Sequence, residues 1–340
     1  MLALTLSGGG ARGIHDDFGE IVSLENLFLA WREFRKGKSA RPDVQQFELH
    51  LEDNIFAIHR QLKTRTYRPA KYSAFYVKDP KLRHIHKATV ADRLVHHALF
   101  RILYPIFDRA FIYDSYSCRV AKGTHGGVIR LEKFLKNLNQ NSRQQVWAMK
   151  CDIKKFFDSV DHKIFKFLIR KKVDDSNTLW LIDIIIDSFE KSTTAGLPLG
   201  NVTSQLFANI YLNELDQFVK RKLKVKYYLR YCDDFIFLSN DKNDFKVWYG
   251  QVAAFLKQRL KLSIHEHKTT IKKYRQGVDF LGYVLLSGHR VLRTKTKRRI
   301  FKKFEREELS EFSAQSYLGV LKHCNGYNLR KKLLILRDLG

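Results

Sequence analysis

The spacing of apolar residues predicts several helices in this chain. After Pro42, apolar residues recur every three or four positions, which places them on one face of an α-helix. The residues of that face are Val44, Phe47, Leu51, Ile55, Ile58 and Leu62. Similar patterns predict helices over residues 90–107, 164–171 and 204–224. Helices therefore make up one part of the expected fold.

Other segments have the composition of strands and turns. Residues 72–77 should be extended, and residues 146–152 resemble a strand. Residues 227–239 carry β-branched and aromatic side chains on both sides of a Cys-Asp-Asp centre, which predicts a β-hairpin. Residues 196–200, Gly-Leu-Pro-Leu-Gly, should form a rigid loop. No repeat or linker separates these elements, so the subdomains should pack continuously.

The net charge of the chain indicates a polyanionic partner. The 340 residues include 62 Lys and Arg but only 35 Asp and Glu, a formal net charge of +27. Each cation that neutralises a phosphate releases condensed counterions, so the excess favours a nucleic acid. An anionic membrane is the rival partner. However, no apolar run approaches the ~20 residues of a spanning helix, and the N-terminus lacks a signal-peptide pattern. We expect a cytoplasmic protein with no membrane partner.

Adjacent carboxylates stand at the centre of the predicted hairpin. Asp233 and Asp234 repel each other, and strand propensity does not favour them there. Mg²⁺, which prefers carboxylate and phosphate oxygens, would remove the conflict, although a solvated turn would also accommodate the pair. Asp152 favours the metal, because it closes an apolar strand where an unpaired carboxylate is costly. Three carboxylates on neighbouring strands can hold two ions about 3.5–4 Å apart, the spacing used in phosphoryl transfer.

The order of these motifs resembles the reverse transcriptase family. That family carries an Asp followed by an aromatic pair, and then a Tyr-x-Asp-Asp hairpin. Here Asp152 precedes Phe156 and Phe157, and Tyr231-Cys-Asp-Asp234 follows about 80 residues after Asp152. Further family blocks occur in the same order, so the resemblance covers roughly residues 64–340. These blocks begin at Tyr67, Lys78, Asp92, Tyr113, Lys122, Gly196, Ala208, His265 and Phe280.

The resemblance implies a right-hand polymerase of the α+β class. Fingers would span residues 40–145, an antiparallel-sheet palm with the catalytic site residues 146–288, and a helical thumb residues 289–340. Residues 1–39 would form an N-terminal leader and a helix. Composition changes at the thumb limit, because residues 290–340 hold 14 Lys and Arg and 5 Asp and Glu. This net charge of +9 suits a subdomain that faces RNA.

The implied activity is RNA-directed DNA synthesis. A primer 3′-hydroxyl would attack the α-phosphate of a dNTP, and pyrophosphate would leave. Two Mg²⁺ ions, which Mn²⁺ can replace, would be held by Asp152, Asp233 and Asp234 together with Ile153. Lys268 matches the family's lysine that protonates pyrophosphate, and its alternative is an ordinary surface lysine. The partners would be template RNA, the RNA/DNA hybrid and dNTPs.

Other positions match the family's nucleotide and template contacts. Phe157 would be the ring that excludes a ribose 2′-hydroxyl, with a core aromatic residue as the alternative. Lys78 and Arg83 would hold the triphosphate, a role suited to preorganised cations, or else belong to a solvated surface. Gln205 would contact the dNTP. Template and primer contacts would come from Gly200, Asn201, Gly282 and Tyr283.

The template loop favours one subtype of this family. Group II intron and retron members usually carry Gln-Gly-x-Pro there, whereas this chain has Leu199-Gly-Asn-Val-Thr-Ser-Gln205. The Leu-Gly-x-x-x-Ser-Gln form is similar to the error-prone enzymes of diversity-generating retroelements. The length of 340 residues also fits that group. The protein would then be encoded by a bacterium, archaeon or phage, with a small basic helical accessory protein as a further partner.

Three alternatives stay open at this point. Another bacterial reverse transcriptase, of antiviral-defence, retron or group II intron type, could share the loop. The group II intron type is the less expected of these, because no DNA-binding or zinc-ligand endonuclease segment follows the expected thumb. A non-catalytic RNA-binding scaffold would keep the charge, but the intact carboxylates argue against it. Residues 7–13, Ser-Gly-Gly-Gly-Ala-Arg-Gly, resemble the oxyanion loop of patatin-like lipases. They suggest a lipid hydrolase as the third alternative. The Gly-x-Ser-x-Gly nucleophile elbow of those enzymes is absent, so we expect residues 7–13 to belong to a flexible leader.

Overall fold

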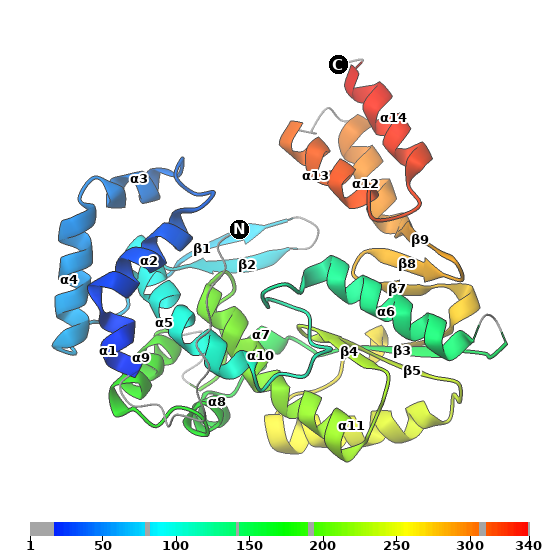
Figure 1. The fold of residues 1–340 in the computed structure, drawn as a ribbon, viewed down its shortest axis with the longest axis horizontal. Helices are drawn as coiled ribbons and strands as arrows, with labels where there is room; N and C mark the ends of the chain where they lie inside the picture. Colours follow the sequence, from blue (N-terminus) through cyan, green and yellow to red (C-terminus); the bar gives the residue numbers. More distant parts are fainter. Residues whose placement is uncertain (1–16, 79–81, 141–142, 190–193, 306–310, 339–340) are drawn as a thin grey trace, which may run out of the picture. The chain divides into compact units, whose positions relative to one another are not determined.

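Two compact units, each assembled from several chain segments, make up the protein. The computed structural model describes residues 17–78, 82–140, 143–189, 194–305 and 311–338 (Figure 1). The glycine-rich segment at residues 7–13 lies outside these ranges. Unit 1 comprises Met1–Phe111, Lys155–Glu214 and Leu260–Leu262. Unit 2 comprises Ile112–Lys154, Leu215–Arg259 and Ser263–Gly340.

The described part of unit 1 is mainly helical and has one antiparallel hairpin. Buried apolar residues such as Leu27 and Leu99 join its N-terminal helices to α5. The hairpin pairs β1 with β2, and Val77 lies opposite Arg83. The elements of unit 1 are α1 (Asp17–Val22), α2 (Leu24–Arg35), α3 (Pro42–Glu48), α4 (Leu51–Lys63), β1 (Ser73–Val77), β2 (Arg83–Lys87), α5 (Val90–Asp108), α7 (Phe156–Ser159), α8 (His162–Arg170), α9 (Ser176–Asp187) and most of α10 (Val202–Gln217).

The single helix predicted after Pro42 is wrong, because the chain forms two helices there. α3 ends at Glu48 and α4 begins at Leu51. His50 leaves the helical region of backbone space, with φ −125° and ψ 46°. The Asn54 side chain then donates a hydrogen bond to the Phe47 carbonyl at 2.9 Å, which satisfies a group left open by the break. The apolar spacing of four continues across the break, so periodicity alone did not reveal it.

Unit 2 contains two antiparallel sheets with helices packed on them. Its four-stranded sheet has the order β4-β5-β3-β6, and its three-stranded sheet the order β7-β8-β9. The elements of unit 2 are α6 (Gly123–Asn139), β3 (Trp147–Asp152), η1 (Phe218–Lys222), β4 (Tyr228–Tyr231), β5 (Asp234–Ser239), α11 (Asp244–Leu260), η2 (Glu266–Lys268), β6 (Thr270–Lys273), η3 (Tyr274–Gln276), β7 (Val278–Phe280), β8 (Tyr283–Leu286), β9 (His289–Leu292), α12 (Thr294–Glu305), α13 (Glu311–Leu321) and α14 (Tyr327–Asp338).

The two faces of β5 explain how unit 2 encloses its larger sheet. Ile236 and Leu238 join a core that includes Leu131 of α6, while Phe237 contacts Trp248 of α11 with ring centroids 5.8 Å apart. Successive side chains of a strand point to opposite faces, so α6 and α11 cover opposite sides of this sheet, as Figure 1 shows. Every position of β5 after Asp234 is thereby buried, which fixes the register of the strand that carries this carboxylate.

Most of the predicted elements are present. Helices 90–107 and 164–171 correspond to α5 and α8, and helix 204–224 corresponds to α10 followed by a π-helical turn. The strand at 146–152 and the hairpin at 227–239 correspond to β3 and β4–β5. Helices with antiparallel sheets confirm the α+β class. The change in composition after Gly288 falls within the β8–β9 hairpin, and the C-terminal helices begin at Thr294.

Candidate active site

Strand pairing brings the predicted carboxylates of unit 2 together. In the antiparallel register of β3 and β5, Asp152 lies directly opposite Asp234. The β4–β5 hairpin turns through Cys232 and Asp233, with Tyr231 opposite Asp234. Cys232 has φ 54°, a left-handed conformation that costs free energy for a residue with a side chain. The tight turn therefore holds Asp233 beside the facing pair.

Burial and mutual repulsion perturb these carboxylates. Burial, followed by the charges of Asp234 and Asp152, raises the pKa of Asp233 to about 6. Burial also raises the pKa of Asp234, against the opposing effect of Lys150, whose Nζ lies 3.4 Å from Asp234 Oδ1. The Lys268 ammonium forms an ion pair with Asp152. The nearby lysines therefore do not fully compensate the negative charge of Asp233 and Asp234.

The donor chemistry of this cluster fits a hard divalent cation. Carboxylate oxygens are the preferred protein ligands of Mg²⁺, and a cation would relieve the repulsion that raises the Asp233 pKa. Within the described ranges, no three acidic, histidine or cysteine side chains converge as a ready-made set of metal ligands. Instead, the ammonium groups of Lys150 and Lys268 reach two of the carboxylates. Bound ions would therefore take over the charge compensation that these lysines provide.

Ile153 and Lys268 lie in the same part of unit 2. The Ile153 amide donates a hydrogen bond to the Asp233 carbonyl at 3.1 Å, which ties the end of β3 to the hairpin turn. Ile153 also forms an isolated antiparallel bridge with Ile264, just before the short helix η2 that carries Lys268. The structure therefore gathers Asp152, Ile153, Asp233, Asp234 and Lys268 into one site.

A fully buried ion pair beneath the hairpin was missed by the sequence analysis. Arg230 donates to both carboxylate oxygens of Asp216 at 2.8 and 2.6 Å, and both side chains are fully buried. Tyr228 also donates to Asp216, at 2.8 Å, and Arg230 donates to the Cys232 carbonyl at 3.1 Å. The pair thus supports the turn that carries Asp233. The available signal was Arg230 itself, which shares an inward strand face with Tyr228.

Phe157 and the predicted template loop, residues 196–205, lie together in unit 1. Phe156 is buried, whereas Phe157 is half-buried and keeps part of its ring accessible. The Phe157 carbonyl accepts a hydrogen bond from the Leu197 amide at 2.7 Å, and the Gly196 amide donates to the Val160 carbonyl at 2.9 Å. The loop is therefore anchored directly to the backbone of the residue predicted to select the sugar.

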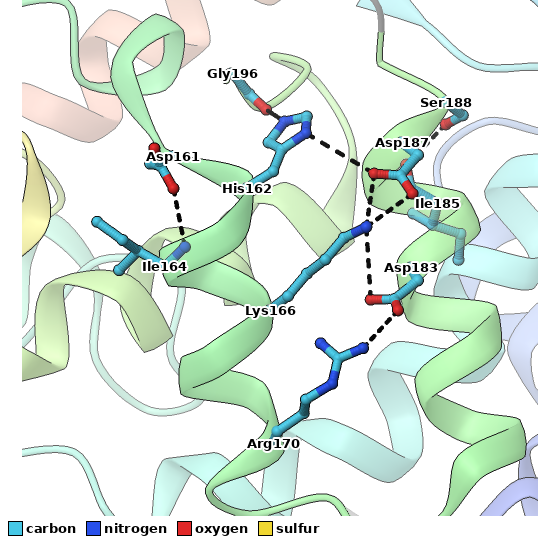
Figure 2. A network of polar contacts seen from close by, with 10 residues as sticks. All are labelled: Asp161, His162, Ile164, Lys166, Arg170, Asp183, Ile185, Asp187, Ser188 and Gly196. Carbon is cyan, nitrogen blue, oxygen red and sulfur yellow. Dashed lines mark hydrogen bonds and ion pairs between the residues drawn. The ribbon is translucent and has the colours of Figure 1, made fainter. Parts of the chain in front are cut away.

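A polar network on α8 and α9 holds the start of this loop (Figure 2). The His162 ring lies between the Gly196 carbonyl, 2.8 Å from Nε2, and Asp187, 4.0 Å from Nδ1. Lys166 Nζ contacts Asp187 at 2.7 Å and Asp183 at 3.9 Å. His162 is buried and connects the loop to these surface ion pairs. The network positions the loop and was not anticipated from the sequence.

The remaining predicted contacts of unit 1 lie on the β1–β2 hairpin and at the start of α10. Lys78 and Arg83 are exposed at the end of the β1–β2 hairpin, and Gln205 is exposed on α10. Gly200, with φ 113°, and the buried Asn201 lead into α10. These five residues belong to unit 1.

The predicted primer-contact turn belongs to unit 2. Gly282, with φ 91°, turns the chain between β7 and β8, a conformation that favours glycine. Tyr283 follows and is buried, and its hydroxyl donates to the Val320 carbonyl of α13 at 3.1 Å. Tyr283 therefore braces this turn against the C-terminal helices.

An antiparallel sheet that sets Asp152 opposite Asp234, with Asp233 in the adjoining turn, defines an α+β protein with a candidate metal-dependent active site. Comparison with known sequences gives the family. The sequence model described as "Reverse transcriptase (RNA-dependent DNA polymerase)" matches residues 77–285, more than half of the chain. The protein belongs to the reverse transcriptase family.

Several curated proteins are similar to this chain. The group II intron-encoded protein LtrA of Lactococcus lactis subsp. cremoris is 27% identical, in an alignment that covers 73% of this chain and 51% of LtrA. Protein YkfC of Escherichia coli K12 is 24% identical, covering 78% of this chain and 79% of YkfC. The retron Ec73 reverse transcriptase of Escherichia coli is 30% identical, covering 46% and 54%. The chain spans about half the length of LtrA. No helix in the described ranges is long and apolar enough to cross a membrane.

Proposed function

We propose that this protein is an RNA-directed DNA polymerase that extends a primer on an RNA template. The primer 3′-hydroxyl attacks the α-phosphate of a dNTP, and pyrophosphate leaves. The observation that carries this proposal is the facing of Asp152 and Asp234, with Asp233 beside them, in a chain of the reverse transcriptase family. These carboxylates, with Ile153, would hold two Mg²⁺ ions, or Mn²⁺ in their place. Bound ions would stabilise charge on the attacking and leaving oxygens.

The protein's own residues would supply position and charge. Lys78, Arg83 and Gln205 would bind the dNTP, while Gly200, Asn201, Gly282 and Tyr283 would bind or support template and primer. Lys268, whose ammonium pairs with Asp152, would protonate pyrophosphate as that group departs. In this proposal, residues 40–145 act as fingers, 146–288 as palm and 289–340 as thumb.

Single-nucleotide addition tests the proposal and separates it from an RNA-binding scaffold. A DNA primer annealed to a defined RNA is offered one dNTP at a time with Mg²⁺. We expect addition only of the nucleotide complementary to the next template base. RNA binding without any nucleotide addition would instead support the scaffold.

Phe157→Ala should allow the enzyme to incorporate ribonucleotides. The half-buried ring would exclude a 2′-hydroxyl, and its backbone stays anchored through Leu197 when the ring is removed. We expect the preference for dNTP over rNTP, measured as a ratio of kcat/KM, to fall by at least about tenfold, equivalent to ~1.4 kcal/mol. Phe156→Leu, a change in the neighbouring core ring, serves as the control. Unchanged selectivity of Phe157→Ala would make Phe157 a packing residue.

The basic face of α12 should bind RNA. Lys295, Arg298 and Lys302 are exposed at positions that share one side of this helix. Replacing all three by Gln should weaken RNA binding and lower the slope of log K against log salt by about two, given ~0.7–0.9 per phosphate contact. The matched control replaces the exposed Lys246, Lys257 and Arg259 of α11. Equal effects of the two triple variants would reject a specific role for α12.

We further propose that the enzyme is the error-prone type found in diversity-generating retroelements, acting in the cytoplasm with a small basic accessory protein. The loop from Leu199 to Gln205 supports this subtype. The named relatives include group II intron and retron proteins, and they support the alternative of another bacterial reverse transcriptase. Fidelity distinguishes the two readings.

Copying of a defined RNA should show errors concentrated opposite template adenines. Leu199 cannot offer the side-chain hydrogen bonds of the Gln usual at this position, and ~1.4 kcal/mol of lost discrimination raises error about tenfold. The Leu199→Gln variant should lower the adenine error, measured by sequencing the product. The Leu199 carbonyl, which accepts from the His86 amide at 3.2 Å, is unaffected by this substitution. Uniformly low error would reject the subtype but not the polymerase.

A further inference from the structure

A cavity in unit 1 has more hydrogen-bonding capacity than the protein itself uses. Its volume is about 180 Å³, and its walls come from α2, the hairpin β1–β2, α5 and the start of α10. At ~30 Å³ per water molecule, it has room for about six waters, the scale of a single ring system. Phe34, Lys38, Arg41 and Phe75 of this wall precede residue 77, where the match to the family begins.

Two buried polar side chains line this cavity without partners of their own. His96 and Asn201 are 1% and 2% exposed, and neither ring nitrogen of His96 nor either amide atom of Asn201 has a hydrogen-bond partner within the described structure. Burial, with Arg93 nearby, lowers the pKa of His96 to about 4, so the ring is neutral at physiological pH. A neutral imidazole and a primary amide each offer both a donor and an acceptor. Leaving such groups unpaired is costly, which indicates a ligand.

The apolar part of the wall suits a flat ring. Phe34 and Phe75 contribute aromatic side chains and Ile85 an aliphatic one. Gly200 closes the wall tightly, because a Cβ added there would lie 3.3 Å from Ile85 Cγ2. The loop is held at this distance by the His86 amide, which donates to the Leu199 carbonyl at 3.2 Å.

The rim of the cavity is strongly cationic. Lys38, Arg41, Lys87 and Arg93 line it, and Asp43 pairs with Lys87 at 2.7 Å and with Arg93 at 2.5 Å. Four cations against this one carboxylate leave a net charge of +3. Burial, followed by the charges of Arg41 and Arg93, lowers the pKa of Lys38, as expected where cations crowd together. The rim therefore favours a ligand that carries negative charge.

The hydrogen-bonding groups and the charge of this cavity favour a nucleotide over a simple anion as its ligand. A phosphate oxygen accepts hydrogen bonds but does not donate them, so a phosphate alone would leave the Asn201 oxygen and one His96 nitrogen unpaired. A nucleobase edge both donates and accepts, and its ring can lie against aromatic side chains. We propose that this cavity receives one unpaired nucleobase of the RNA template, with the flanking phosphates on the cationic rim. This inference rests on the proposed RNA-copying function and adds a base-reading site next to the template loop.

Apolar replacement of the two unpartnered side chains tests the proposal. In Asn201→Leu and His96→Leu, the free protein loses no hydrogen bond, so its melting temperature should stay the same or rise. Binding is measured with a ten-nucleotide single-stranded RNA and with the same strand carrying abasic residues. The affinity advantage of the base-bearing strand should shrink by about tenfold in each variant.

Asn26 provides a matched control in the same unit. It is 5% exposed, but its amide donates to the carbonyls of Ile21 and Ala98, and its oxygen accepts from Arg101. Asn26→Leu should therefore lower the melting temperature and leave the advantage of the base-bearing strand unchanged. The opposite pattern, a stability loss in Asn201→Leu with unchanged RNA binding, would overturn the proposal.

The cationic rim gives a second, separable result. Lys38→Gln with Arg41→Gln should weaken the base-bearing and abasic strands equally and lower the salt slope by about 1.4, at ~0.7 per contact with a single strand. Inorganic pyrophosphate that displaces both strands equally from the wild type, with no effect of Asn201→Leu, would show an anion site and overturn base recognition.

Performing these binding measurements in the Asp233→Asn background keeps them independent of catalysis. Normal template copying by the wild type, together with base-independent binding, overturns only this inference. A wild type that neither binds nor copies RNA overturns the proposed function as well.

Discussion

Asp233→Asn should reduce the rate of nucleotide addition by at least about a thousandfold and leave the fold intact. Loss of a metal-ligand charge removes several kcal/mol of stabilisation from the transition state, and ~4 kcal/mol corresponds to a thousandfold. The same substitution relieves the repulsion that raises the pKa of Asp233 to about 6. The free energy of unfolding should therefore not fall. Rates come from rapid-quench single-nucleotide addition, and stability from urea unfolding.

Asp241→Asn is the control for this variant. Asp241 is exposed after β5 and accepts a hydrogen bond from the Asn243 amide at 2.8 Å, which Asn can also accept. Its activity should match the wild type. Near-normal nucleotide addition by Asp233→Asn would remove Asp233 from the metal site.

Asp216→Asn should lower the free energy of unfolding by about 3–5 kcal/mol, because it leaves the buried Arg230 guanidinium without its counter-charge. Asp187→Asn is the contrast, since Asp187 is 57% exposed and its pair with Lys166 should contribute under ~1 kcal/mol. Both values follow from urea unfolding. A loss below ~1 kcal/mol for Asp216→Asn would show that water or another group satisfies Arg230.

The carboxylate site was largely predictable from sequence because its strands carry a strong local pattern. Aromatic and β-branched residues flank Asp233 and Asp234, and Asp152 ends an apolar run, so both strands and their chemistry could be read together. The register that sets Asp152 opposite Asp234 confirms that the two segments pair. The individual roles of the site residues stay predictions.

Features that leave no recognisable pattern in the sequence could not be predicted from it. Asp216 precedes Arg230 by 14 residues and lies at the end of α10, where an acidic residue normally indicates a solvated helix end. The break at His50 preserves the apolar spacing, so no periodic signal marks it. The cavity at His96 and Asn201 is built from four elements, and its unpaired atoms appear only once those elements are folded together.

The most direct test is to copy one defined RNA with the wild type and with Asp233→Asn side by side, in Mg²⁺ and all four dNTPs. The account predicts DNA from the wild type whose sequence complements the RNA, and no such product from the variant. Absence of RNA-templated DNA from the wild type, or equal yields from both proteins, would contradict it.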